Sequence, residues 1–327
     1  MPETAASAEA PPEALNADGE PRRVGVEIEF ANVTVRDSAA LVEDLFGGTQ
    51  EPESDHRVVI SGTRFGDFNV ELDWQGAHKK NDDAMQAETE IDLEGSARAI
   101  AGHVVAGLVP TEVVCPPIPW NELDALNALF DALRAAGAEG TEAGLLYGFG
   151  LHLNPEVAEQ SADYALRHLQ AYAILEEWLR REIDIDPMRR ALPHIDPFPP
   201  DYLRRIMPDD YAPDLKPLIR EYAEGNQTRN RGLDMTPLFR HLDEDTLLSA
   251  MQDCGLIKAR PTFHYRLPDA RLSEPGWNAV VEWNRWLEVE KLAADPDRLA
   301  ARRRAFNEWL EKPVYERWLE AMPDPLA

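Results

Sequence analysis

Alternation of apolar side chains in the segment RRVGVEIEFANVTV, residues 22–35, is the feature that most constrains the fold. A period of two residues is typical of a β-strand with one buried face. Glu27 and Glu29 stand between the apolar positions, so both point to the opposite face, about 7 Å apart. The positions that repeat on the apolar face are Val24, Val26, Ile28 and Phe30. The strand therefore predicts a sheet whose second face carries paired carboxylates.

This acidic pair has two interpretations. An antiparallel sheet often exposes one face to water, and two glutamates on such a face need no partner. Glutamate is, however, depleted in strands, which argues against a plain solvated face. If Glu27 and Glu29 are buried, both cannot stay ionised unless a cation lies nearby. The pair is therefore a candidate metal-binding site.

The first half of the chain alternates strand-like and helical segments, and the second half is mainly helical. Further strands are expected over residues 56–62, 68–75, 110–117, 143–156 and 260–268. Helices are expected over residues 37–48, 96–110, 121–138 and 162–183, and two Trp-rich helices near the C-terminus. Ser38 is the expected cap of the first helix. The stretch from Pro187 to Pro217 is expected to be extended, and the fold class is α+β.

Composition limits the compartment and the partners. The 60 acidic residues outnumber the 33 basic ones, which gives a formal net charge of −27. Such a surface repels nucleic acid and anionic lipid, so we expect neither as a partner. Residues 1–21 lack aromatic residues and an apolar period, and predict a disordered tail rather than a secretion signal. With no long apolar stretch and only Cys115 and Cys254, a cytoplasmic protein is expected, with Cys115 in the core.

Three other strand segments carry candidate site residues. Glu112 begins a strand that ends at prolines, and His152 lies in a glycine-rich strand where a ligand can approach the backbone closely. A lone histidine is more often an ordinary core or surface residue. The last strand alternates polar residues on one face: Arg260, Thr262, His264 and Arg266. Such a face either meets an anion or is an edge beside the acidic surface.

The order of these motifs carries a resemblance. GVEIEF, then EVVCPP before a helix that ends in GA, then GLHLN before a long helix, then RPTFHYR before a Trp-rich helix, resembles the amidoligase family. That family belongs to the carboxylate–amine ligases related to glutamine synthetase and glutamate–cysteine ligase. The resemblance covers about residues 22–293, which it implies as the catalytic domain, with residues 294–327 as a helical extension.

The resemblance implies a fold and an activity. The expected fold is a glutamine-synthetase-like, curved, mainly antiparallel sheet with helices packed outside and a helical C-terminal part. The expected activity is ATP-dependent formation of an amide or peptide bond through an acyl phosphate. The implied cofactors are ATP with Mg²⁺ or Mn²⁺, and the implied partners are small-molecule or peptide carboxylates and amines.

Individual roles follow from the resemblance as well. The residues that match metal ligands are Glu27, Glu29, Glu112 and His152. Arg266 matches an arginine expected to contact phosphate, Arg229 lies where the family carries another, and Asp73 matches an acid near the substrate. Arg260, His264 and Arg266 are the implied nucleotide-binding residues. Divalent ions and arginines suit this chemistry because both neutralise the phosphate charge that repels an attacking carboxylate.

The chain departs from the family pattern at two positions. Asn154 stands where a second histidine is usual, and His264 stands where a glutamate is usual. Exchanging glutamate for histidine removes a hard oxygen ligand and favours softer metals. Two alternatives therefore stay open: a non-catalytic binding or scaffold relative of the same fold, and a metal-dependent hydrolase that uses His152 and the carboxylates to activate water.

Overall fold

The computed structural model describes residues 6–73, 109–141, 148–185, 195–251 and 257–312. Within them the chain forms a large, open, antiparallel sheet with helices, which agrees with the predicted α+β class. Residues 96–108 of the helix predicted over residues 96–110, and the residue Cys254, lie outside the described residues. No helix among those described is both long and apolar enough to cross a membrane.

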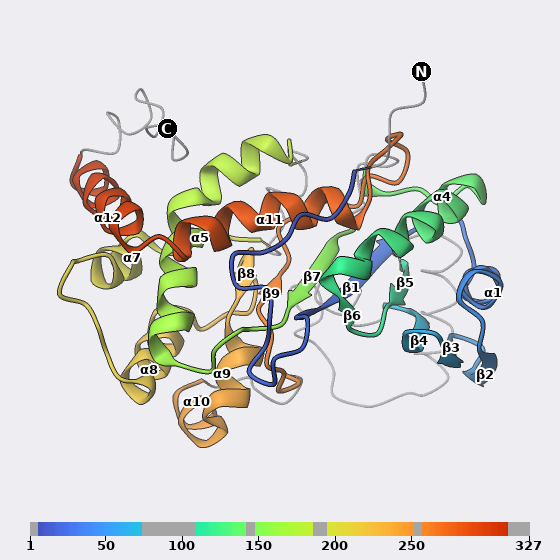
Figure 1. Cartoon of the computed structure of the whole chain (residues 1–327), viewed down its shortest axis with the longest axis horizontal. Helices are drawn as coiled ribbons and strands as arrows, with labels where there is room; N and C mark the ends of the chain where they lie inside the picture. Colours follow the sequence, from blue (N-terminus) through green and yellow to red (C-terminus); the bar gives the residue numbers. More distant parts are fainter. Residues whose placement is uncertain (1–5, 74–108, 142–147, 186–194, 252–256, 313–327) are drawn as a thin grey trace, which may run out of the picture.

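The sheet has β1 near its middle and shorter strands toward one side (Figure 1). Its order is β2-β3-β4-β5-β1-β7-β9-β8, and β6 pairs with the start of β1. The strands are β1 (Arg23–Phe30), β2 (Thr49–Ser54), β3 (Arg57–Thr63), β4 (Gly66–Leu72), β5 (Thr111–Val114), β6 (Ile118–Pro119), β7 (Leu151–Pro155), β8 (Leu233–Asp234) and β9 (His264–Tyr265). The predicted strand over residues 260–268 is thus reduced to His264 and Tyr265.

The helices pack mainly against one face of this sheet, and α5 lies against α11 (Figure 1). The longest, α5, begins after Ser161, whose side chain accepts a hydrogen bond from the Tyr164 amide. The helices are α1 (Val35–Phe46), η1 (Trp120–Leu126), α4 (Asn127–Ala135), α5 (Ala162–Glu182), α7 (Pro200–Ile206), α8 (Leu215–Gly225), α9 (Thr236–Leu242), α10 (Glu244–Ala250), α11 (Ala279–Ala293) and α12 (Pro296–Glu311).

The apolar face of β1 is buried as the alternation predicts. All four of its apolar side chains have no exposed surface. On the neighbouring strands the same face is covered by helices, because Phe46 of α1 stacks on Phe68 of β4, and Trp286 of α11 packs against Tyr265 of β9. Burying large aromatic side chains on one face leaves the opposite face of the sheet for polar residues.

Several local predictions were wrong. The cap of α1 is Thr34, which accepts from the Asp37 amide, while Ser38 is buried inside the helix. The helix predicted over residues 121–138 is divided into η1 and α4. The proline-rich stretch contains the helix α7, because Pro200 occupies the first turn, where a missing N–H costs nothing.

The N-terminal segment differs from the predicted disordered tail over residues 6–21. The Ala8 amide donates to Asp124 at 2.7 Å, and the Glu9 amide donates to Asn284 at 3.0 Å. The indole of Trp283 donates to the Glu9 carbonyl at 3.0 Å. Side chains of η1 and α11 therefore form hydrogen bonds with the backbone of this segment, which has too few apolar residues to form a core of its own. At the other end, α12 packs on α5 and α7.

Candidate active site

Strand register brings the predicted acidic residues and histidine together on the polar face of the sheet. On β1, Glu27 lies opposite His152 of β7, and Glu29 lies opposite Glu112 of β5. Among the residues that the structure describes, two sets of side chains have ligand atoms that all lie within 4.8 Å of one another. One set is Glu27, His152 and His264, and the other is Glu29, Glu112 and His152.

Glu27 is held by contacts to both of its carboxylate oxygens. Oε1 accepts hydrogen bonds from Asn154 Nδ2 at 2.9 Å and from Arg260 Nη1 at 3.1 Å. Oε2 lies 3.4 Å from His152 Nδ1. Burial alone raises the pKa of Glu27, but the hydrogen bond with His152 and electrostatic interactions with His264, His152 and Arg260 hold this pKa well below its usual range. Glu27 is therefore a carboxylate at neutral pH.

Glu29 and Glu112 belong to a row of glutamates that runs across three strands. Glu112 lies opposite Glu29 on one side and opposite Glu71 of β4 on the other. The Gly150 amide donates to Glu29 Oε2 at 2.8 Å. The pKa of Glu112 is raised well above its usual range, first by burial and then by the negative charges of Glu27, Glu29 and further acids nearby. A divalent cation with oxygen ligands would relieve this repulsion, so the residues fit such an ion.

His264 connects this cluster to a buried acid on β8. Its Nδ1 lies 3.5 Å from Asp234 Oδ2, and Asp234 also accepts from the Thr236 amide and hydroxyl at 3.0 and 2.6 Å. Burial raises the pKa of Asp234, but His264, Arg229 and Thr236 together hold it well below its usual range. Burial lowers the pKa of His264 to about 4, so its imidazole is neutral at pH 7.

The predicted arginines lie near Asp234, His264 and Glu27 rather than within the row of glutamates. Arg229 Nε donates to Asp234 Oδ2 at 3.1 Å, and Arg266 Nη1 donates to the Arg229 carbonyl at 2.8 Å. Arg260 reaches Glu27 from outside any strand. Asp73 is close enough to Glu112 to raise its pKa. All the candidate residues thus gather around one face, while their roles stay predictions.

Some residues of this cluster were not anticipated. Asp234 is fully buried, and only its place before Thr236 and a proline hinted at a capping role. Asn154, taken from the sequence as a departure from a family pattern, orients Glu27. Its side chain lies across Gly25, where an added Cβ would come within 3.3 Å of the Asn154 Cβ. Glycine at that position makes room for the asparagine.

Cys115 is a core residue, as expected, and we predict that Cys115→Ser retains full turnover. The thiol is 4% exposed, and burial raises its pKa, so it is a neutral, unreactive group at neutral pH. Turnover should be compared with the unsubstituted protein after circular dichroism has shown equal folding. A folded but inactive variant would indicate chemistry that needs the thiol.

A model of the family described as "Putative amidoligase enzyme" matches residues 20–288 of the 327-residue chain. The chain belongs to this family. The match includes the central strand β1 at one end and β9 with most of α11 at the other, so every candidate residue from Glu27 to Arg266 lies within it. No curated protein and no solved structure matches the chain.

Membership of this family agrees with the resemblance seen in the ordered motifs. The match ends at residue 288, before α12 begins at Pro296. The polar face described above is therefore a property of the family-matched region of the chain. The enzyme class that the family name gives, a ligase forming amide bonds, is the starting point for the function proposed below.

Proposed function

We propose that this chain is an ATP-dependent carboxylate–amine ligase that forms an amide or peptide bond through an acyl phosphate. The observation that carries the proposal is the convergence of Glu27, Glu29, Glu112 and His152 on one sheet face, with arginines beside it. The family match supports the ligase class. We also propose that the open antiparallel sheet is a glutamine-synthetase-like fold, with the polar face as its substrate-binding side.

The cation ligands are assigned from the crowding of carboxylates. Glu29 and Glu112 would hold a Mg²⁺ or Mn²⁺ ion, because oxygen ligands suit these hard ions. When bound, such ions neutralise phosphate charge and polarise the phosphorus that is attacked. The raised pKa of Glu112 fits this assignment. Burial and the neighbouring acids disfavour the ionised form of this carboxyl group, and a bound cation would stabilise that form.

The reaction divides into two displacements. A carboxylate oxygen of the acid substrate bonds to the γ-phosphorus of ATP, and the bond from that phosphorus to the bridging oxygen breaks to release ADP. The amine nitrogen then bonds to the carbonyl carbon, phosphate leaves, and the nitrogen loses a proton. Arg266 and Arg229, beside the cluster, would hold the negative charge of the transferring group. Asp73 would contact the amine substrate near Glu112.

Arg260 has a second role in this scheme. Its Nη1 donates to Glu27 at 3.1 Å, and its side chain is 33% exposed, so it can reach both the carboxylate and a bound nucleotide. Bidentate guanidinium groups suit phosphate oxygens. The expected setting is the cytoplasm, where ATP is available, and the substrates are small or peptide-sized acids and amines.

The proposal is tested by measuring ADP and phosphate release from ATP with Mg²⁺ and a panel of carboxylates and amines. Release should require both an acid and an amine, and mass spectrometry should identify a condensed product smaller by one water than the sum of the two. Product formation without ATP would instead indicate a hydrolase acting in reverse. Absence of nucleotide binding together with absence of turnover would indicate a scaffold protein and overturn the ligase assignment.

We predict that divalent-ion binding releases a proton from Glu112. The pKa of this residue is raised in the metal-free protein, so a fraction of the molecules carries a proton on Glu112, and a cation must displace this proton. Mg²⁺ affinity should therefore rise with pH until the raised pKa has been passed. Calorimetry in two buffers of different ionisation enthalpy measures the number of protons released. Glu112→Gln should remove this buffer dependence, and an unchanged dependence would place the titrating group elsewhere.

A further inference from the structure

His264 is buried without a hydrogen-bond partner for either ring nitrogen among the described residues. Its exposed fraction is 6%, and Asp234 Oδ2 lies 3.5 Å from Nδ1, at the limit of hydrogen bonding. Leaving a buried polar group unpaired costs about 1–3 kcal/mol. This cost is removed in a state in which a bound ligand contacts a ring nitrogen of His264.

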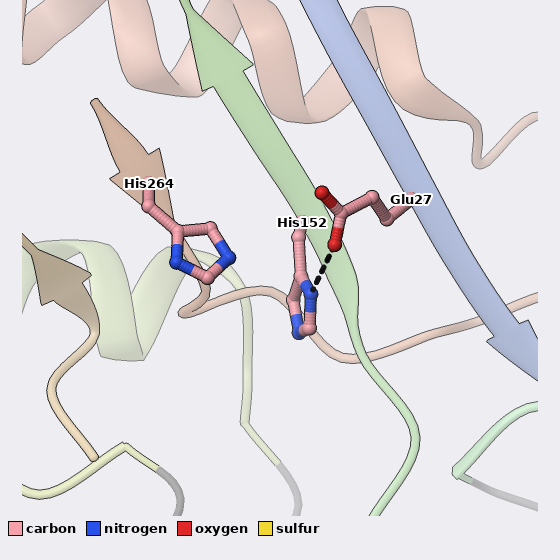
Figure 2. A group of neighbouring side chains, drawn as sticks. All are labelled: Glu27, His152 and His264. Carbon is pink, nitrogen blue, oxygen red and sulfur yellow. Dashed lines mark hydrogen bonds and ion pairs between the residues drawn. The ribbon is translucent and has the colours of Figure 1, made fainter. Parts of the chain in front are cut away.

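Two other potential metal ligands, Glu27 and His152, lie near His264. Figure 2 shows Glu27, His152 and His264 projecting from three neighbouring strands toward a common region, with one His264 nitrogen on the side of His152. The two imidazole rings are nearly perpendicular, at 88°, with centroids 5.5 Å apart. One ligand atom from each residue lies within 4.8 Å of the others. Three donors of this kind can approach a single ion from different directions.

The spacing of one pair already matches a coordination shell. Glu27 Oε2 and His152 Nδ1 are 3.4 Å apart. Two ligands of a tetrahedral ion with bonds of about 2.0–2.1 Å lie about 3.4 Å from each other. The ligand atom of His264 lies within 4.8 Å of the other two, which places it as the third donor.

His264 and Glu27 each contact further polar residues that orient them, as the ligands of metal sites usually do. Asp234 lies against the Nδ1 side of His264, which leaves Nε2 as the ligand atom. Asn154 and Arg260 bind Oε1 of Glu27, which leaves Oε2 on the side of His152. Fixing a carboxylate by one oxygen presents the other as a single ligand. The arrangement suits a monodentate glutamate with two imidazoles.

We propose that His264 completes a metal site with Glu27 and His152, two of the ligands that the resemblance implies, and makes this site selective for Zn²⁺ over Mg²⁺. Imidazole nitrogen suits zinc, whereas magnesium takes oxygen ligands in octahedral geometry. Two histidines and a glutamate are a known set of zinc ligands that leaves a fourth position open to water or substrate. Glu29 and Glu112 remain for the hard ion, an assignment that rests on the proposed function. The chain thus binds one soft and one hard cation on one sheet face.

The site is tested with the full-length chain stripped of metal by a chelator. Co²⁺, which replaces zinc and reports its coordination in visible absorption, should bind at one equivalent with the intense bands of a four- or five-coordinate site. Zn²⁺ should displace it, and the same excess of Mg²⁺ should not. X-ray absorption of the zinc-loaded protein should give two imidazole ligands. An oxygen-only shell, or no zinc binding at all, would overturn the proposal.

Variants assign the ligands. His264→Ala should weaken Zn²⁺ affinity by at least about 100-fold, and Asp234→Asn, which removes the charge behind His264, by about 10–100-fold. His56→Gln is the matched control, because His56 is exposed in the turn between β2 and β3 and should leave zinc affinity unchanged. Circular dichroism checks folding of each variant. Unchanged zinc affinity in folded His264→Ala would also overturn the site.

These measurements use no ATP, so they separate this inference from the ligase proposal. Zinc binding without any ATP-dependent turnover would contradict the proposed function and leave the zinc site standing. Turnover with Mg²⁺ alone, in a protein whose zinc affinity is no greater than that of His264→Ala, would contradict the zinc site and leave the ligase standing.

Discussion

Replacing Glu29 or Glu27 by glutamine should reduce amide-bond formation by at least about 1,000-fold while the protein stays folded. Each carboxylate lies on the polar face of β1, and the amide keeps its shape but removes its charge. Loss of one anionic ligand weakens the stabilisation of phosphate charge by several kcal/mol, and about 4 kcal/mol corresponds to 1,000-fold in rate. Product formation at saturating ATP and Mg²⁺ measures the effect.

The control for these variants is Glu122→Gln. Glu122 is exposed in η1, away from the polar face, and its replacement should leave turnover within about twofold because it contributes no charge to the site. Thermal unfolding should show both site variants folded. Full activity in Glu27→Gln and in Glu29→Gln would remove both residues from the chemistry.

Glu290→Gln should lower the free energy of unfolding by about 3–5 kcal/mol and the melting temperature by roughly 10 °C. Arg22 donates to Glu290 through both terminal nitrogens, at 2.8 and 2.7 Å, and the two side chains are 1% and 2% exposed. The indole of Trp286 donates to the same carboxylate at 2.8 Å. Removing the negative charge leaves a buried guanidinium without its counter-ion, which is the costly step.

The pH dependence of this pair has a definite sign. Burial raises the pKa of Glu290, but the charge and hydrogen bonds of Arg22 outweigh it and lower the pKa below its usual value. The stabilisation is therefore present at neutral pH and is lost as the pH falls through the lowered pKa. Glu290→Gln should reduce the difference in melting temperature between neutral and acidic solution.

An exposed ion pair supplies the control for stability. Arg304 Nη1 and Asp209 Oδ2 are 3.2 Å apart, with side chains 58% and 53% exposed. Arg304→Gln should change the free energy of unfolding by less than about 1 kcal/mol, because water screens the pair. Arg22→Met combined with Glu290→Leu should recover part of the lost stability, since no unpaired charge is then buried. Equal effects in Glu290→Gln and Arg304→Gln would contradict the role given to the buried pair.

Local periodicity predicted the parts of the fold that depend on neighbouring residues. The alternation in β1 predicted the buried and polar faces of the sheet, and the helix predicted over residues 162–183 has bounds close to those of α5. Boundaries set by tertiary contacts were missed. The break between η1 and α4, the helix α7 in a proline-rich stretch and the short strand β9 depend on what packs against each segment.

The candidate site was predictable as a set of residues but not as an arrangement. Glu27 and Glu29 share a face because successive side chains of a strand alternate, and this follows from their spacing alone. The spacing of these residues does not predict which strands pair with β1. Pairing with β7 places His152 opposite Glu27, and pairing with β5 places Glu112 opposite Glu29.

The amino-acid sequence by itself determined the composition of the polar face, the apolar face beneath it and the membership of a ligase family. Only the tertiary structure decided that Asn154 and Arg260 hold one oxygen of Glu27, and that Asp234 lies behind an unpaired His264. The physical reason is that charge and hydrogen bonding act through space over a few ångströms. Residues more than 200 positions apart in the chain, such as Glu27 and Arg260, become neighbours only when the sheet has formed.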